Sequence, residues 1–275
     1  MPIIPKKSIE ESPTVLPWEK KTGGGIVNAV ADFLQGYVVL PRETLVVIAA
    51  WIVASWMMDV WDRFPHLAVT SPEKRCGKTL LLRLIEQLVR NPRNTANISP
   101  AAIYRLIGRE PLTLLLDEAQ SLSRRSESSE VTRELLNASI DKKQKVTRCG
   151  GSKEGHAVQD FSVYCPKVVS LIGSLDEVLA DRCIPVRMER KSGRDEVLPY
   201  RSRKVEPLAA EVRTRIEGWA EANRDAVQGV FDRLEPFDIE NDRMAELLLP
   251  LQAAVIVDEG ADSRVRRVRR VRRGY

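Results

Sequence analysis

Residues 66–90 have the pattern of a short strand, a tight loop and an amphipathic helix, and this constrains the fold more than any other feature. The loop, SPEKRCGKT, ends in Gly77-Lys78-Thr79. Apolar residues at positions 81, 84, 85 and 88 then recur at the spacing of one helix face. Because the N–H groups of such a loop and of the helix start surround an anion, the pattern predicts a phosphate-binding site.

This loop is a variant of the common phosphate-binding loop. Pro72 stands where another glycine is usual, but the position needs only a negative φ, which proline supplies. We expect Lys78 to reach the β and γ phosphates of ATP and the Thr79 hydroxyl to bind Mg²⁺. The residues expected to bind the nucleotide are Pro72, Glu73, Lys74, Arg75, Cys76, Gly77, Lys78, Thr79 and Leu80.

A second motif supplies carboxylates. An apolar run, LTLLL, leads directly into Asp117 and Glu118. In a nucleotide site Asp117 orients the magnesium shell and Glu118 polarises the attacking water. The alternative is a buried strand that ends in a solvated acidic turn. Strands alternating with helices predict an α/β fold with a largely parallel sheet, so both motifs are expected at the carboxyl ends of strands.

Composition divides the chain into four segments. We expect a flexible leader and short helix over 1–35, an ATPase core over 36–200, a helical part over 201–260 and an Arg-rich tail over 261–275. Within these segments we expect an apolar helix from about Arg42 to Trp61, a strand over Thr95–Ile98, a helix over 206–230 and a last helical stretch interrupted at Pro250.

The charge is concentrated in the tail. Its seven arginines account for the net charge of +5, and the other residues carry −2. The tail is either an electrostatic patch for phosphates or a frayed low-complexity end. The longest apolar run, Leu45–Met58, is too short for a membrane span, and the four cysteines are widely spaced. We therefore expect a cytoplasmic protein with reduced thiols and no membrane contact.

The segments LAVTSPEKRCGKTLLLRLIEQL, TANISPAAIYRLI, LTLLLDEAQ and GSLDEVLADRCIPVRMER together resemble domain-of-unknown-function family 3631. The resemblance covers about residues 36–257. It implies a phage, plasmid or mobile-element ATPase similar to AAA+ or superfamily-3 helicase domains, often linked to a primase. It also implies a P-loop NTPase of the additional-strand class, with helical additions at both ends, that forms a homo-oligomer such as a ring.

The resemblance gives roles to two further regions. Arg182, just before the last strand, would reach the γ-phosphate on a neighbouring subunit, although a salt bridge with Asp181 or Asp176 is the alternative. Ser170 and Ser174 are the candidate sensor residues near the γ-phosphate.

A hairpin before the sensor strand, with its tip at 150–156, would contact single-stranded or forked DNA. Its candidate contacts are Lys142, Lys143, Lys145, Arg148, Lys153 and His156. The alternative is a solvated basic loop. Binding through phosphates alone would weaken steeply with salt.

Three functions remain open on the sequence. The first is an oligomeric ATPase that acts on DNA as a helicase-like motor. The second is a nucleotide-gated adaptor or loader that binds ATP and a partner without appreciable turnover. The third is a small-molecule kinase, which Glu118 after Asp117 disfavours because that pair is typical of hydrolysis.

Overall fold

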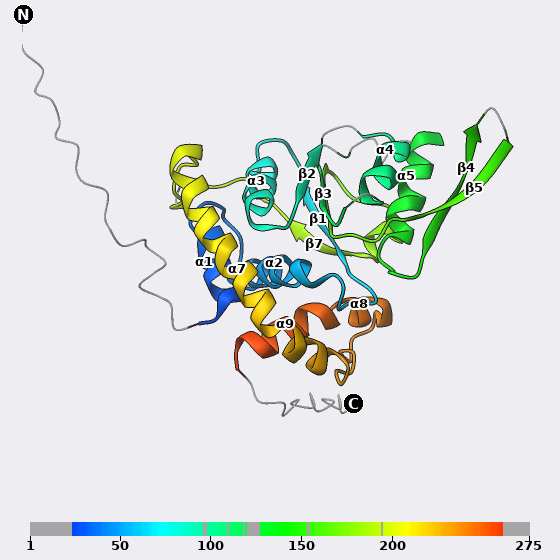
Figure 1. Cartoon of the computed structure of the whole chain (residues 1–275). Coiled ribbons are helices and arrows are strands. Elements are labelled where there is room, and N and C mark those ends of the chain that lie inside the picture. Colours follow the sequence, from blue (N-terminus) through cyan, green and yellow to red (C-terminus); the bar gives the residue numbers. More distant parts are fainter. Residues whose placement is uncertain are drawn as a thin grey trace, which may run out of the picture.

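The computed structural model describes residues 24–95, 98–108, 110–117, 119, 127–152, 155–193 and 195–260. Its centre is a five-stranded sheet in the spatial order β2-β3-β6-β1-β7, and every pairing between these strands is parallel (Figure 1). The strands are β1 (His66–Ser71), β2 (Pro92–Thr95), β3 (Thr113–Leu116), β6 (Lys167–Ile172) and β7 (Cys183–Arg187). The predicted α/β fold class with a parallel central sheet is confirmed.

The order of the strands carries a further point about the class. Strand β6 lies between β1, which precedes the phosphate loop, and β3, which precedes Asp117. An extra strand in this position is what the additional-strand class of P-loop NTPases predicts. Because the strands are buried on both faces, they read as apolar runs in the sequence.

Two apolar clusters cover the two faces of the sheet. Along β1, Leu67 and Val69 belong to one cluster while Ala68 belongs to the other, as the alternation of strand side chains requires. The first face carries α1 (Ile26–Gln35), α2 (Arg42–Ala54), α3 (Lys78–Leu88), α7 (Ser202–Phe231) and α9 (Leu249–Asp258). The second face carries α4 (Pro100–Ile107), α5 (Glu127–Ala138) and α6 (Glu177–Ala180).

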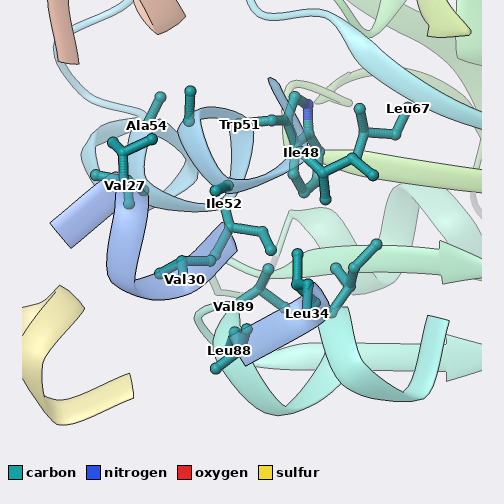
Figure 2. Packing of buried hydrophobic residues seen from close by; sticks show 14 of the residues in the cluster. Val27, Val30, Leu34, Ile48, Trp51, Ile52, Ala54, Leu67, Leu88 and Val89 are labelled. Carbon is teal, nitrogen blue, oxygen red and sulfur yellow. The ribbon is translucent and has the colours of Figure 1, made fainter. Parts of the chain in front are cut away.

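The apolar run of the sequence is a core helix. Helix α2 is buried along most of its length, and Figure 2 shows Ile48, Trp51 and Ile52 packed among residues of α1, α3 and β1. The Trp51 indole N–H donates to the Pro65 carbonyl at 2.8 Å, which satisfies its polar atom inside the core. Among the described helices, none is both long and apolar enough to cross a membrane.

The predicted end of this helix at Trp61 is wrong. Helix α2 ends at Ala54 and continues as a short 3₁₀ turn, η2 (Ser55–Met57). Side chains occupy the carbonyls at this end: Ser55 Oγ donates to the Ile52 carbonyl at 2.6 Å, and Trp61 Nε1 donates to the Ala54 carbonyl at 2.9 Å. These bonds compete with continuation of the helix.

The predicted strand over Thr95–Ile98 is also misplaced. Strand β2 spans Pro92–Thr95, so it begins immediately after the turn that contains Asn91. Proline donates no hydrogen bond, and β2 is an edge strand with Pro92 as its first residue, where no donor is needed. A proline at the start of a strand is compatible with an edge position, which the sequence alone does not indicate.

The carboxyl-terminal helices close the first face. Helix α7 begins at Ser202, a turn earlier than expected, and buries Val205. A break at Leu248 separates α8 (Asp242–Leu247) from α9, close to the predicted interruption at Pro250. The Asp258 carboxylate then accepts bonds from the N–H groups of Ile26 and Val27, at 2.7 and 2.9 Å. The last described helix thereby caps the first.

A separate two-stranded sheet projects from the body (Figure 1). Strands β4 (Lys145–Ser152) and β5 (Gly155–Ser162) pair antiparallel, from Lys145 opposite Ser162 to Ser152 opposite Gly155. The predicted hairpin is therefore confirmed. Near its base, the Phe161 ring packs on Tyr104 of α4 with the ring centroids 4.6 Å apart.

A buried histidine connects β1 to α5. His66 Nε2 lies 3.1 Å from the Leu136 carbonyl and 3.1 Å from Ser139 Oγ. Burial, and after it the nearby charge of Lys167, lowers the pKa of His66 to about 3. The imidazole is therefore neutral in the folded chain at every pH above that value.

We expect this histidine to make stability depend on pH. Below about pH 6.5 the unfolded chain takes up a proton that the folded chain refuses, so stability falls as the pH falls. Between pH 6.5 and pH 5 the expected loss is about 2 kcal/mol, which urea denaturation of the wild type and His66→Gln at both pH values would measure. An equal loss in the variant would contradict this origin.

Candidate functional site

The loop between β1 and α3 has a backbone that few sequences adopt. Arg75 has φ of 66° and Gly77 has φ of 84°, so two of its residues are left-handed. Turns that contain such residues aim successive N–H groups into one concavity, which favours anions. A non-glycine residue in this region is uncommon and is found most often at functional sites.

The lysine of the loop is held at the end of β1. Lys78 Nζ donates to Ser71 Oγ at 2.5 Å, and Ser71 Oγ donates in turn to the Glu73 carbonyl at 2.6 Å. Ser71 is the last residue of β1 and is buried. The ammonium group therefore lies at the carboxyl end of β1, where the loop begins.

The start of α3 has no cap of its own. Its N-cap is Gly77, which has no side chain to bond the first N–H groups, and no acidic residue lies in the first turn. The N–H groups of Lys78, Thr79 and Leu80 lack partners within the helix at such a position. An uncapped helix start beside a lysine attracts an anion such as a phosphate.

Gly77 also makes room for a close neighbour. A β-carbon on Gly77 would lie 3.3 Å from the methyl carbon of Met188, which follows β7. The Met188 N–H donates to the Thr70 carbonyl at 2.7 Å, so this methionine is fixed beside β1. Both the left-handed φ and the packing therefore require glycine at this position.

The acidic strand ends on the same face and at the same edge as the loop. Leu115 on β3 and Val168 on β6 belong to the cluster that covers α3. Two residues further along each strand, Asp117 and Ser170 point to that same face. Lys78, Asp117 and Ser170 therefore lie toward the carboxyl ends of the parallel strands, on one face of the sheet.

The two candidate sensor serines differ in their surroundings. Ser170 is completely buried, and its hydroxyl has no hydrogen-bond partner within the described part of the chain. Ser174 is exposed beyond the end of β6, after Gly173, whose φ is 96°. A buried hydroxyl without a partner is costly in a folded protein and is often explained by a missing ligand or water.

Glu118, the predicted base, lies outside the described residues, although its neighbour Asp117 is fixed by a bond from its N–H to the Thr95 carbonyl at 3.0 Å. Its role stays a prediction.

Arg182 lies at the other end of the parallel strands, beside the start of β1. Its carbonyl accepts from the His66 N–H at 3.0 Å, at the start of β1, whereas Lys78 follows the end of β1. Its guanidinium donates to two backbone carbonyls, through Nε to Asn137 at 3.3 Å and through Nη1 to Val178. Within one chain Arg182 therefore lies away from the phosphate loop, and the salt-bridge alternative with Asp181 or Asp176 is absent from the described contacts.

The candidate DNA contacts of the hairpin differ in their surroundings. Lys143 and Lys145 are exposed, whereas the Lys142 ammonium donates to the Asp59 carbonyl at 2.7 Å. His156 lies on β5 opposite Gly151. Lys153, at the tip, lies outside the described residues.

The sequence did not identify two residues that contact the loop. Ser71, the lysine's partner, could have been recognised as the last residue of the strand before the loop. Met188 could not, because its contact with Gly77 depends on the pairing of β7 with β1.

No protein-family model matches the chain, and no curated protein matches it. Among solved structures it is similar to JCV Helicase bound to a substituted acetamide, with 13% identity, 88% of this chain and 63% of that chain covered, and a TM-score of 0.40. Another JCV Helicase structure has 13% identity, with 85% of this chain and 61% of that chain covered and a TM-score of 0.40. The apo structure of an NrS-1 C-terminal region has 12% identity, with 85% of this chain and 51% of that chain covered and a TM-score of 0.41.

The chain spans between about half and two thirds of the length of these structures. At such TM-scores the similarity carries no argument about the site, whose roles rest on this chain's own residues. The resemblance to family 3631 stays a prediction.

We expect Gly77→Ala to destabilise the chain by about 1–2 kcal/mol, because alanine is strained at a left-handed φ. Gly218→Ala is the matched control, since Gly218 is exposed inside α7 with no atom near its β-position. Alanine there should stabilise the chain by about 0.5–1 kcal/mol. Urea denaturation measures both, and equal effects in the two variants would contradict the strain at Gly77.

Proposed function

We propose that this chain binds and hydrolyses ATP and acts on DNA as a helicase-like or replication-associated motor of a phage or mobile element. The observation that supports this best is the uncapped start of α3, with Lys78 beside it and Asp117 on the same face and edge. These groups offer N–H donors and an ammonium for phosphates, together with oxygen ligands for a magnesium ion.

The donors present fit a magnesium–triphosphate. The loop from Pro72 to Leu80 supplies N–H groups, and Lys78 neutralises charge on the β and γ phosphates. The Thr79 hydroxyl and Asp117 would hold Mg²⁺, since hydroxyl and carboxylate oxygens are the ligands it prefers. When bound, Mg²⁺ stabilises charge that develops on the phosphate oxygens.

The remaining roles concern the attacking water. Glu118, directly after Asp117, would accept a proton from the water that attacks the γ-phosphate. The Ser170 hydroxyl is buried on the face of the sheet that α3 covers, and it has no hydrogen-bond partner within the described residues. Ser170 is therefore the better sensor candidate of the two serines. Arg182 would serve the site of a neighbouring copy, because its own loop lies at the other edge of the sheet.

The hairpin is the proposed DNA contact. It projects from the body (Figure 1). Lys143, just before β4, and Lys145, its first residue, are exposed. Such a surface holds the phosphates of a single strand by charge and reads no bases. We further propose a homo-oligomer, and a primase or other replication protein as partner.

A nucleotide-gated adaptor is the second candidate. The Lys78–Ser71 contact favours it in one respect, because a lysine already tied to its own strand is compatible with binding that proceeds without turnover. Phosphate release with and without single-stranded DNA separates the two candidates, since the adaptor releases almost none.

We expect Lys78→Ala to abolish ATP binding and Glu118→Gln to retain binding while turnover falls by about 100-fold or more. Lys204→Ala, an exposed lysine at the start of α7, is the control and should leave both unchanged. Binding is measured by calorimetry and turnover by phosphate release. Full turnover in Glu118→Gln would overturn the role of that carboxylate.

We expect the pair Lys143→Ala and Lys145→Ala to weaken single-stranded DNA binding and to reduce its salt dependence. Each lost phosphate contact should lower the slope of log affinity against log salt by about 0.7. The control pair, Lys191→Ala and Lys204→Ala, removes the same charge from exposed positions elsewhere. An unchanged slope in the hairpin pair would assign DNA binding to another surface.

A further inference from the structure

A lysine is buried in the core at the amino ends of the parallel strands. Lys167, the first residue of β6, is completely buried. Its Nζ donates to the Val163 carbonyl at 2.8 Å, to the Cys165 carbonyl at 3.1 Å and to Cys165 Sγ at 3.2 Å. None of the ion pairs between described residues includes this lysine. Among its three bonded partners, only the thiol is able to become an anion beside the amine.

The fold fixes the backbone on both sides of the cysteine. The Leu114 N–H of β3 donates to the Pro166 carbonyl at 2.9 Å, which holds the residue that follows Cys165. The Tyr164 hydroxyl donates to the Trp61 carbonyl at 2.9 Å, which holds the residue before it. Cys165 is itself buried in the apolar cluster of the second face. The lysine nitrogen and the sulfur are therefore kept in contact by the native packing.

The contact between the two groups favours reactivity at both. Burial lowers the pKa of Lys167, while the neighbouring Cys165 sulfur acts in the opposite direction. An amine beside a thiol and an ammonium beside a thiolate have the same total charge, so a proton passes between them without changing the charge of the core. A thiolate is the form of cysteine that peroxides oxidise, and a neutral amine is a nucleophile. The groups needed for an oxidation and for a following condensation therefore meet at one contact.

We propose that Cys165 and Lys167 form a site of reversible oxidation, at which a peroxide oxidises the thiol and the lysine nitrogen then bonds to the sulfur. In the first step the O–O bond of the peroxide breaks, one oxygen bonds to the sulfur and the other leaves as water, so the thiol becomes a sulfenic acid. In the second step the amine attacks that sulfur, the S–O bond breaks, and the hydroxyl leaves as water with a proton from the amine. The sulfur gives two electrons to the peroxide, and the product is a sulfenamide.

The position of the lysine decides what happens to the sulfenic acid. A sulfenic acid condenses with a thiol or a nitrogen, or it is oxidised further to a sulfinic acid that ordinary thiols do not reduce. Because Lys167 Nζ already contacts the sulfur, condensation precedes the second oxidation. A cellular thiol then displaces the amine as a mixed disulfide with Cys165, and a second thiol releases the cysteine. This site lies at the amino end of β6, whereas the phosphate loop follows the carboxyl end of β1, so the inference does not depend on the proposed function.

Cys183 provides a matched comparison within the same chain. It is the first residue of β7, and its side chain is 2% exposed, against 4% for Cys165. Burial raises the pKa of its thiol to about 12. Its sulfur receives no hydrogen bond from a described lysine, whereas the sulfur of Cys165 does. Cys183 therefore has the burial of Cys165 without the amine, and we expect it to remain a thiol.

The test treats the full chain with a small excess of hydrogen peroxide, alkylates the free thiols, and measures the tryptic peptides by mass spectrometry. Trypsin cleaves after Lys167 only while its amine is free, so the linked chain should give one uncleaved peptide over 154–182. This peptide contains Cys165 as its single cysteine, so a disulfide within it is impossible. We expect it to be unalkylated and lighter than the reduced peptide by two hydrogen atoms, about 2 Da. Dithiothreitol should restore both the thiol and the cleavage.

Two variants separate the roles of the nitrogen and the sulfur. In Lys167→Met the sulfur has no amine, so Cys165 should gain oxygen atoms and no linked peptide should form. In Cys165→Ser trypsin should still cleave after Lys167. Circular dichroism checks that both variants fold, and the wild-type measurement stands without them. A wild-type Cys165 that remains a thiol, any mass change of the 154–182 peptide other than that loss, or equal oxidation of Cys183 would overturn the inference.

Discussion

The parallel pairing of β6 between β1 and β3 is the constraint on which the site depends. It fixes Val69 beside Ser170 and Leu116 beside Val169, so the ends of three strands are in register. Because side chains alternate along each strand, this register also decides the face on which Ser71, Ser170 and Asp117 point. A slip of one residue in β6 would turn Ser170 away from α3 and break both apolar clusters. The core and the site therefore share one determinant.

Buried polar groups stabilise the other end of the sheet, beside the amino ends of its strands. The carbonyls at the end of α5 bond to His66 Nε2 and to Arg182 Nε, and Lys167 Nζ donates to the carbonyls of Val163 and Cys165. Such groups are stable in a core only while every partner is in place. The chain leaves α5 and enters β4 within a few residues, so the proposed DNA hairpin and Arg182 are supported by the same helix end. A movement of the hairpin that displaced the end of α5 would change the hydrogen bond between Arg182 Nε and the Asn137 carbonyl.

Local chemistry explains which parts could be predicted from the sequence. The loop, the apolar strand before Asp117 and the hairpin all have short-range patterns, and each lies where it was expected. The carboxyl end of α2 and the position of β2 were predicted wrongly, because they depend on the hydrogen bond from Trp61 to the Ala54 carbonyl and on β2 being an edge strand. The contact between α8 and the end of α6 could not be predicted either. Arg243 and Asn241 lie about sixty positions after Asp181, and only the folded chain brings them to its carboxylate.

The positions of the phosphate loop and of Arg182 at opposite ends of β1 bear on the proposal that this chain is an ATPase that works as an oligomer. The phosphate loop follows the carboxyl end of β1, whereas Arg182 lies beside its amino end. Because β1 and β7 are parallel, Arg182 of one chain lies away from that chain's own loop. Two copies avoid this separation when the amino ends of the strands in one copy face the carboxyl ends of the strands in the next. Arg182 of the first copy then faces the phosphate loop of the second. That contact is head-to-tail, and a head-to-tail contact repeated with a constant rotation closes into a ring or continues as a filament. Under the proposed function, hydrolysis in one copy would then alter the contact made by its neighbour's Arg182, so turnover would depend on the arrangement of the copies.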